Sequence, residues 1–319
     1  MKKILSYICC IMIASLSYAQ TSQTPSILEA DIIQAEKLIE AYFSPMAKSF
    51  GTGLNSGWYN TAKPHNLGGF DITFTLNTVI IPEAARSFII MNEFEGVFTS
   101  DTDPSGSTIY GSSDVTPMVY ANSAENIDVD FKMPGGFNIP AMPLPMIQAG
   151  VGLIKNTAID IRYMPMLNVG DDIKVKLFGA GLKHDLFQWI PGIGDAIPMS
   201  LSLQAGYTSL NTDLKIYDQR VDLNTKATTI NIIASKKILM FTGYAGIGYN
   251  SSTTTFSADA NFNLDGIKFE ERIEAKFESI NDLRTNIGLR FNIAIATIQA
   301  DYTFSKYPTA TLGMGISLR

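Results

Sequence analysis

The feature that most constrains this chain is an alternation of apolar and polar residues that recurs along most of its length. In the first such segment the apolar members are Phe70, Ile72, Phe74 and Leu76, and a polar residue stands between each pair. The same pattern recurs at 159–163, 173–177, 201–207, 287–293, 298–305 and 312–318. Successive side chains of a strand point to opposite faces, so each segment predicts a strand with one apolar and one polar face.

An all-β chain of this kind could form either a soluble sandwich or a transmembrane barrel, because both show this alternation. Several segments approach the roughly 9–11 residues that a tilted membrane strand needs. Aromatic residues also stand toward segment ends, as interface girdles require: Tyr163, Tyr207, Tyr249, Tyr302 and Phe304. We therefore expect an antiparallel transmembrane β-barrel of 12 or 14 strands, with 14 preferred. Weaker strands are expected at 93–99 and 127–132, and outer loops at 101–126, 187–196 and 251–282.

The first residues predict an export signal. Lys2 and Lys3 precede an apolar stretch at 4–16 that is too short to span a bilayer. Small residues then stand at the positions that a signal peptidase reads, and we expect cleavage after Ala19. No later stretch has the about 18 uninterrupted apolar residues of a transmembrane helix. An exported chain without such a helix is a soluble protein or a barrel, and the alternation favours the barrel.

Cleavage would change what chemistry the chain can perform. Cys9 and Cys10 are its two cysteines, so the mature protein would have no disulfide, no thiolate metal site and no catalytic cysteine. Its formal charge would move from −6 to −8, because both lysines of the signal also leave. An acidic exported chain without a basic cluster is not expected to bind nucleic acid.

Ahead of the alternating segments the spacing predicts an amphipathic helix. Ser26 and Glu29 have the spacing of a capping box, and apolar residues then recur at steps of three and four. The apolar stripe consists of Leu28, Ile32, Ala35, Ile39, Tyr42 and Met46. Pro45 and the pair Gly51 and Gly53 predict its end. A single amphipathic helix needs a surface to cover its stripe, so we expect it to plug the barrel or seal its mouth.

Three parts follow from these patterns. Residues 1–19 are expected to be the signal peptide. Residues 20–56 are expected to form the helix, either as a plug or as a periplasmic segment. Residues 57–319 are expected to form the barrel.

Several sequence blocks resemble a family of bacterial outer-membrane barrels with no assigned function. The blocks are Gly57–His65, Leu67–Asp71, Met133–Phe137, Pro143–Met146, Lys183–Asp185 and Gln188–Gly192. The resemblance covers nearly the whole mature chain and implies a barrel in the outer membrane. A more distant resemblance, in architecture alone, is to FadL-type transporters of hydrophobic substrates, which also place a helical segment before the first strand. Fold analogy alone is a poor guide to cargo.

The residues for catalysis or cofactor binding are sparse. His65 and His184 are the only histidines, and no Gly-x-Ser-x-Gly element accompanies them. His184 and Asp185 would point to opposite faces of a strand. The segment 101–106 partly matches a calcium loop but has Ser112 where a bidentate Glu is needed. We therefore expect no enzyme, no catalytic residue, no cofactor and no metal.

The polar faces of the strands predict what lines the lumen, because charged side chains on the lipid face cost several kcal/mol. The candidate lumen-lining residues are Asp160, Arg162, Lys174, Lys176, Gln204, Arg290, Gln299 and Asp301. A second set is expected where the helix meets the barrel: Trp58, Tyr59, Asn60, Lys63 and His65. Charges of both signs could line a water-filled path or pair with one another and fill the interior.

Two functions remain open at this point. The first is a passive outer-membrane channel or transporter for small molecules, hydrophobic ones included. The second is a structural or adaptor barrel that docks a partner protein without transport. The expected partners are outer-membrane lipid, with a small hydrophobic ligand or a protein partner depending on which function holds.

Overall fold

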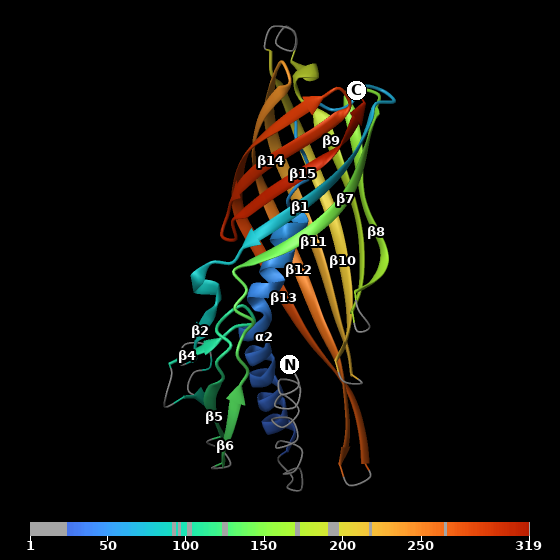
Figure 1. The fold of residues 1–319 in the computed structure, drawn as a ribbon. Coiled ribbons are helices and arrows are strands. Elements are labelled where there is room, and N and C mark those ends of the chain that lie inside the picture. Colours follow the sequence, from blue (N-terminus) through green and yellow to red (C-terminus); the bar gives the residue numbers. More distant parts are fainter. Residues whose placement is uncertain are drawn as a thin grey trace.

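The protein is a closed antiparallel barrel with a helix inside it (Figure 1). The computed structural model describes residues 24–90, 94, 97–100, 104–122, 127–169, 173–190, 198–216, 219–264 and 267–318. The expected signal peptide lies outside these residues. No helix in the described part of the chain is long and apolar enough to cross a membrane.

Ten strands form the barrel, in the order β1-β15-β14-β13-β12-β11-β10-β9-β8-β7 with β7 closing onto β1. They are β1 (Phe70–Ile80), β7 (Ala141–Leu153), β8 (Thr157–Val169), β9 (Ile173–Asp185), β10 (Ser200–Ile216), β11 (Gln219–Ile238), β12 (Phe241–Leu264), β13 (Ile267–Ile293), β14 (Ala296–Phe304) and β15 (Thr309–Leu318). Every pair is antiparallel, and β1 meets β15 with Phe70 opposite Leu318. We call the end of the barrel with the connections 154–156, 239–240 and 294–295 the base.

The expected count of 12 or 14 strands is wrong, because ten strands form the wall and the weaker strands expected at 93–99 and 127–132 lie outside it. Strand length differs from the expectation as well. β12 and β13 have 24 and 27 residues, more than twice what a membrane strand needs. Both continue far past the barrel wall at the extended end, opposite the base (Figure 1). The segment 251–282, expected as a loop, is therefore largely strand. Of the expected outer loop 187–196, the described residues 187–190 follow β9 at the base, where Asp185 N donates to Asn156 O, and the rest of that loop lies outside the described residues.

Two small sheets lie outside the wall. They are β2 (Ser87–Ile89) with β4 (Ser105–Ser107), and β3 (Phe98–Thr99) with β5 (Thr116–Asn122) and β6 (Ile127–Met133). The weaker strands expected at 93–99 and 127–132 correspond to β3 and β6, and the segment 101–126, expected as an outer loop, contains β4 and β5. Short 3-10 turns occur at Glu83–Ala85 and Phe187–Trp189. We call residues 81–140, which connect β1 to β7 and contain both sheets, the cap.

The outer face of the barrel is apolar near the base, as a membrane barrel requires. Exposed large apolar residues there include Ile72, Ile161, Ile232, Ile247, Leu289, Ile298 and Leu312. The inner face at the same height carries buried polar residues, among them Thr73, Gln148, Gln204 and Asn231. The alternation in the sequence thus predicts the two faces correctly for this part of the barrel.

Toward the extended end the two faces exchange character. Leu223, Phe256 and Phe277 point inward and pack against the helix, whereas Glu274 and Lys276 are exposed on the outside. Apolar surface belongs against the helix and charge against water once a strand has left the membrane. Strands that leave a bilayer between these two parts would show this exchange.

A charge placed on the apolar band tests this assignment. Ile232→Arg replaces an outward side chain that is 48% exposed and is expected to destabilise the bilayer-inserted barrel by about 2–4 kcal/mol. Val115→Arg is the control, because Val115 is 52% exposed on the cap, away from the band. Urea unfolding in lipid vesicles measures both variants. Equal stability of the two would contradict a membrane-facing Ile232.

Helix α2 (Thr24–Asn55) runs from the extended end into the lumen (Figure 1). Ile39 and Tyr42 of the predicted stripe are buried, and Met46 is partly buried. Pro45 and Gly51, which were expected to end the helix, lie within it, and the helix continues to Asn55, two residues beyond Gly53 and within the expected segment 20–56. Proline costs about 3 kcal/mol inside a helix, and burial of the helix on both sides of Pro45 offsets that cost.

Gly51 and Gly53, which were predicted to end the helix, allow it to lie close to the barrel wall. A Cβ on Gly51 would lie 1.9 Å from Ser252 Oγ, and one on Gly53 would lie 2.2 Å from Leu144 Cδ1. Real side chains do not tolerate such distances. The helix can therefore fit inside this barrel only with glycine at these two positions or with a displaced wall.

The cap encloses the helix on the side where the barrel wall is short. Leu38 and Tyr42 pack in one cluster with Phe88, Phe98 and Met118. Tyr42 Oη donates to Gly135 O at 3.0 Å, and burial raises the pKa of Tyr42 to about 12, so the phenol stays a donor at neutral pH. Helix, cap and long strands thus form one packed unit at the extended end.

Candidate functional site: the filled lumen

The lumen near the base is filled by the chain that follows the helix. We call residues 54–65 the plug. Leu54, Trp58 and Ala62 in it are buried, and each part of the plug contacts a different side of the wall. The plug joins β1 at the base, where Gly68 N donates to Gly152 O.

Arg162 of β8 holds the end of the helix from one side. It is fully buried, with Nη1 donating to Leu54 O at 2.7 Å and Nη2 to Ser56 O at 2.8 Å. Its Nε donates to Gln148 Oε1 at 3.0 Å. The last carbonyls of a helix lack partners within the helix and carry partial negative charge. A guanidinium is therefore well suited to bind them.

Arg284 of β13 binds the same turn from another side of the barrel. Its Nη1 donates to Asn55 O at 3.0 Å, and its Nε and Nη2 donate to Asn231 Oδ1. Asn77 of β1 adds donation from Nδ2 to Gly53 O and Ser56 O, both at 3.2 Å. Three strands thus bind the carbonyl end of the helix. We call Arg162 and Arg284 the arginine clasp.

The rest of the plug is held to the wall by separate hydrogen bonds. Tyr59 Oη donates to Asn286 Oδ1 at 2.8 Å, and Arg290 Nη1 donates to Asn60 Oδ1 at 2.7 Å. Asn60 Nδ2 in turn donates to Gln299. Nearer the base, Ala62 N donates to Ser235 Oγ at 2.9 Å. These bonds pair polar groups of an irregular segment that is away from bulk water. Among the described residues, none pairs with the buried atoms Asn55 Oδ1, Trp58 Nε1 and His65 Nδ1.

Trp58 is the largest side chain of the plug. Its ring lies 3.7 Å from the guanidinium carbon of Arg162, a cation–π contact. A Cβ on Gly206 would lie 2.5 Å from the indole, so that strand approaches the ring at its backbone. Trp58 therefore fills the lumen at the level of the clasp.

A cluster of three ionisable side chains, His65, Asp71 and Asp160, lies between the plug and the wall at β1. His65 Nε2 and Asp71 Oδ1 are 2.6 Å apart, and Thr73 Oγ1 donates to the other carboxylate oxygen of Asp71 at 2.9 Å. Asp160 is buried beside them, and Gln148 Nε2 donates to its Oδ1 at 3.3 Å. In the part of the chain that the structure describes, no three His, Cys, Asp or Glu side chains are grouped as metal ligands.

His184 lies at the base, where it accepts a hydrogen bond from the 3-10 turn Phe187–Trp189. Trp189 Nε1 donates to His184 Nε2 at 2.8 Å, so the ring proton belongs on Nδ1, which lies 2.8 Å from Thr157 Oγ1. The Thr157 hydroxyl donates in turn to Lys155 O. A histidine with this tautomer donates toward the hydroxyl and does not act as its base.

Most residues expected in the lumen are buried inside the barrel. These are Asp160, Arg162, Gln204, Arg290, Gln299 and Asp301. Of the residues expected at the junction of helix and barrel, four are buried in the plug, Trp58, Tyr59, Asn60 and His65, and Lys63 is exposed at the base. Plug and wall thus bring together residues from both predicted sets, as Arg290 with Asn60 and Arg162 with Trp58 show.

Lys174 and Lys176 are placed elsewhere and require a correction. Both are exposed on the outward face of β9, whereas Leu177 of the same strand points inward into the cluster around Leu54. This part of β9 lies at the extended end, where the inner face is apolar because it packs on the helix. The rule that charges face the lumen holds only near the base, where the outer face of the wall is apolar.

The sequence reasoning missed Arg284 and Gln148, which hold the plug with residues it did find. Arg284 stands between Leu283 and Thr285 in a stretch with a clear alternation two residues later. That signal could have identified it. Gln148 stands in an apolar, proline-rich stretch without a charged neighbour, and nothing there indicated its role.

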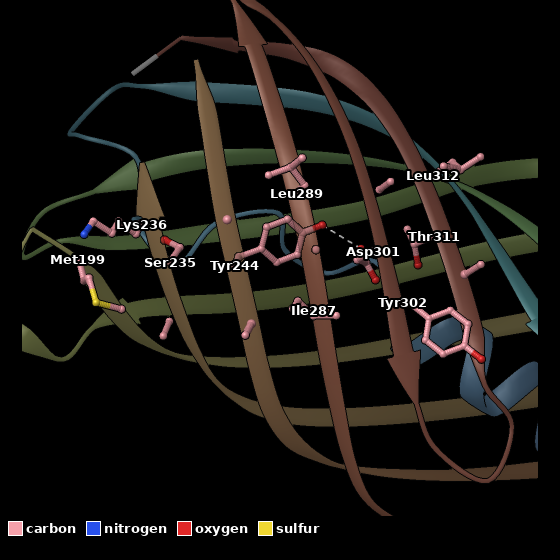
Figure 2. Close-up of a pocket in the computed structure, with 16 residues that line it drawn as sticks. Met199, Ser235, Lys236, Tyr244, Ile287, Leu289, Asp301, Tyr302, Thr311 and Leu312 are labelled. Atoms are coloured by element: carbon pink, nitrogen blue, oxygen red, sulfur yellow. Dashed lines mark hydrogen bonds between the residues drawn. The ribbon is translucent and has the colours of Figure 1, made fainter. Parts of the chain in front are cut away.

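On the outside of the wall lies an apolar hollow of about 870 Å³ (Figure 2). Its lining includes Ile287, Leu289 and Leu312 on the lipid face, with Met199 toward the base. Behind it Tyr244 Oη donates to Asp301 Oδ2 at 3.0 Å (Figure 2). The hollow thus lies against the apolar outer side of the wall, with the buried residues Tyr244 and Asp301 at its inner end.

Fluorescence can monitor whether the plug is in place. The chain has two tryptophans, and Trp58 is 1% exposed whereas Trp189 is 65% exposed. In a Trp189→Phe variant the remaining emission is expected to be blue-shifted and poorly quenched by acrylamide. In a Trp58→Phe variant it is expected to be quenched readily. Equal quenching of the two variants would contradict a buried Trp58.

Residues 1–318 match the family described as "Family of unknown function (DUF6588)". The chain belongs to this family. The resemblance to a barrel family without assigned function is consistent with this match. No curated protein matches the chain significantly.

Several solved structures of barrels resemble the chain weakly. Ail, the attachment invasion locus protein of Yersinia pestis, is 11% identical, with 79% of this chain and 98% of that chain covered and a TM-score of 0.27. The translocator domain of autotransporter NalP from Neisseria meningitidis is 9% identical, with coverage of 86% and 93% and a TM-score of 0.27. The outer membrane protease OmpT from Escherichia coli is 9% identical, with 82% and 97% and a TM-score of 0.29. At these TM-scores no property passes from those proteins to this one.

Proposed function

We propose that this protein is an outer-membrane barrel, closed by its own plug, that anchors and presents the packed unit of helix, cap and long strands. The observation that carries the proposal is the filled lumen, with the arginine clasp bound to the carbonyl end of the helix. A closed wall with an apolar band is the form in which strands span a membrane. This corresponds to the second function that the sequence left open.

The shape of the protein supports an orientation as well. Barrels of bacterial outer membranes have short turns on the periplasmic side and longer elements outside. The base has the tight turns 154–156, 239–240 and 294–295 beside one longer connection, from β9 to β10, and the extended end has the cap and the long strands β12 and β13. We therefore place the base in the periplasm and the packed unit on the cell surface, where it would meet a protein partner.

Transport is the second candidate, and one observation favours it. Near the base the plug is held through a polar inner wall that includes Asp160, Gln204 and Arg290. A wall of this composition would line a wet path if the plug moved out. Passage of small molecules, including the hydrophobic cargo that a FadL-type likeness would imply, thus requires displacement of the plug.

Single-channel recording distinguishes the two candidates. Wild-type protein in a planar lipid bilayer is expected to show no conductance steps under the anchoring function. A double variant, Arg162→Ala with Arg284→Ala, serves as the comparison because it removes the clasp. Steady conductance of the wild type, or its uptake of a hydrophobic dye into vesicles, would refute the anchoring proposal and favour transport.

No catalytic step is part of this proposal. Among the described residues, His65 lies against the carboxylate of Asp71, and His184 donates a hydrogen bond to the hydroxyl of Thr157. Neither arrangement activates a nucleophile. A lipid hydrolase assay that shows turnover lost in the His184→Ala variant would contradict this.

A further inference from the structure

A cup of about 520 Å³ lies at the base, between the plug and the wall. Three of its lining residues are cations: Lys63, Lys237 and Arg290. They come from three separate elements, namely the end of the plug, β11 and β13. Among the residues that the structure describes, none that lines the cup is an aspartate or a glutamate. In a chain with a net charge of −6, this local excess of positive charge needs an explanation.

One of these cations is fixed in place. Arg290 is 3% exposed, and its Nη1 and Nε donate to Asn60 Oδ1 and Asn292 Oδ1, both at 2.7 Å. The other two, Lys63 and Lys237, are exposed to solvent and can adjust to a ligand. A fixed guanidinium with two mobile ammonium groups is suited to an oxyanion.

The remaining lining supplies neutral hydrogen-bonding groups. They are the hydroxyls of Thr61, Ser200, Ser235, Thr242, Thr297 and Ser317 and the amide of Asn292. Ser317 Oγ is itself buried, and no residue in the described part of the chain forms a hydrogen bond with it. Hydroxyls that surround cations can donate to the several oxygens of a phosphate.

We propose that this cup binds a phosphate-bearing anion. The charges, the hydroxyls and the volume agree on this ligand class. Thr61 and Lys63 are plug residues, and Arg290 also holds Asn60 of the plug, so a bound anion contacts the wall and the plug at once. Its binding therefore stabilises the closed lumen.

The phosphate can come from solution or from a lipid headgroup, and the structure relates the cup to the membrane. Met199 and Ser235 line both the cup and the apolar hollow on the lipid face (Figure 2). An anionic phospholipid could thus place its headgroup in the cup and an acyl chain in the hollow. Free phosphate would use the cup alone.

Two probes and one matched control test the site. Protein in a phosphate-free detergent is titrated with inorganic phosphate and, separately, with short-chain phosphatidylglycerol, and binding is followed by calorimetry. Lys63→Gln and Lys237→Gln are each expected to weaken binding about tenfold, because each removes one charged hydrogen-bond donor. Lys236→Gln is the control, since Lys236 is adjacent in sequence but lines the outer hollow (Figure 2).

The outcomes separate the sources of phosphate and decide the proposal. Binding of inorganic phosphate that the double variant Lys63→Gln with Lys237→Gln loses supports the site with a soluble ligand. Binding of phosphatidylglycerol alone, lost in the same variant, supports it with a lipid. Binding of neither probe, or equal binding by wild type and double variant, overturns the proposal. Conductance is a separate measurement, so failure here does not depend on the anchoring function.

Discussion

Arg162→Ala is expected to release the plug. The change removes the Arg162 donors from Leu54 O, Ser56 O and Gln148 Oε1 in a buried site, so that Leu54 O keeps only Thr208 Oγ1 at 3.5 Å and Ser56 O keeps Asn77 Nδ2 at 3.2 Å. It also removes a side chain that fills the lumen beside Trp58. Unpaired buried polar groups cost about 1–3 kcal/mol each, and the empty volume adds to that. We expect a loss of about 3–5 kcal/mol in urea unfolding of the refolded barrel.

The same variant is expected to change conductance. With the helix end no longer held, the plug should leave the lumen part of the time, and intermittent steps should appear in a bilayer recording. Lys176→Ala is the matched control, because it removes a cation from the outward face of β9 and should alter neither readout. An Arg162→Ala barrel that is as stable and as silent as the wild type would show that the clasp does not hold the plug.

Trp58→Ala is expected to have the second large effect. Trp58 is 1% exposed and stands between the Arg162 guanidinium and the backbone at Gly206. Truncation of a buried tryptophan costs about 3–5 kcal/mol. It would also leave a cavity with polar walls, which water can enter. Urea unfolding should show the loss, and small ions should leak through reconstituted vesicles.

Two other variants serve as controls for the stability loss expected of Trp58→Ala. Trp58→Phe keeps an aromatic ring against Arg162 and should retain most of the stability. Trp189→Ala removes an exposed indole at the base and should change stability by no more than about 0.5 kcal/mol. A Trp58→Ala barrel within that same range would mean that the lumen closes without the indole.

The sequence predicts the barrel and its faces well where one physical rule acts along a whole segment. From Phe70 to Leu76 lipid lies on one side and a polar lumen on the other, so the alternation alone predicts which side chains face out. The helix is predicted for the same reason, since Ile39 and Tyr42 lie on the side that becomes buried. In both cases local spacing is enough.

The errors arise where the environment changes along a single strand. Lys176 was expected inside because the rule of the membrane was applied to a part of β9 that lies beyond it. The end of the helix was placed at Pro45 and Gly51 because these residues break isolated helices. The surrounding wall, which no local pattern reveals, both supports the proline and requires the glycine. The strand count was too high for the same reason, as the small sheets pack on the helix and not in the wall.

The exchange of faces along the long strands has a consequence for assembly. The inner sides of β11, β12 and β13 at the extended end are apolar at Leu223, Phe256 and Phe277 and are covered only where helix α2 packs on them. A barrel that closed before the helix entered would leave this surface in water, exposed to other chains. We therefore expect the helix to be in place when this part of the strands forms, with the N-terminal segment as the template on which the extended end folds.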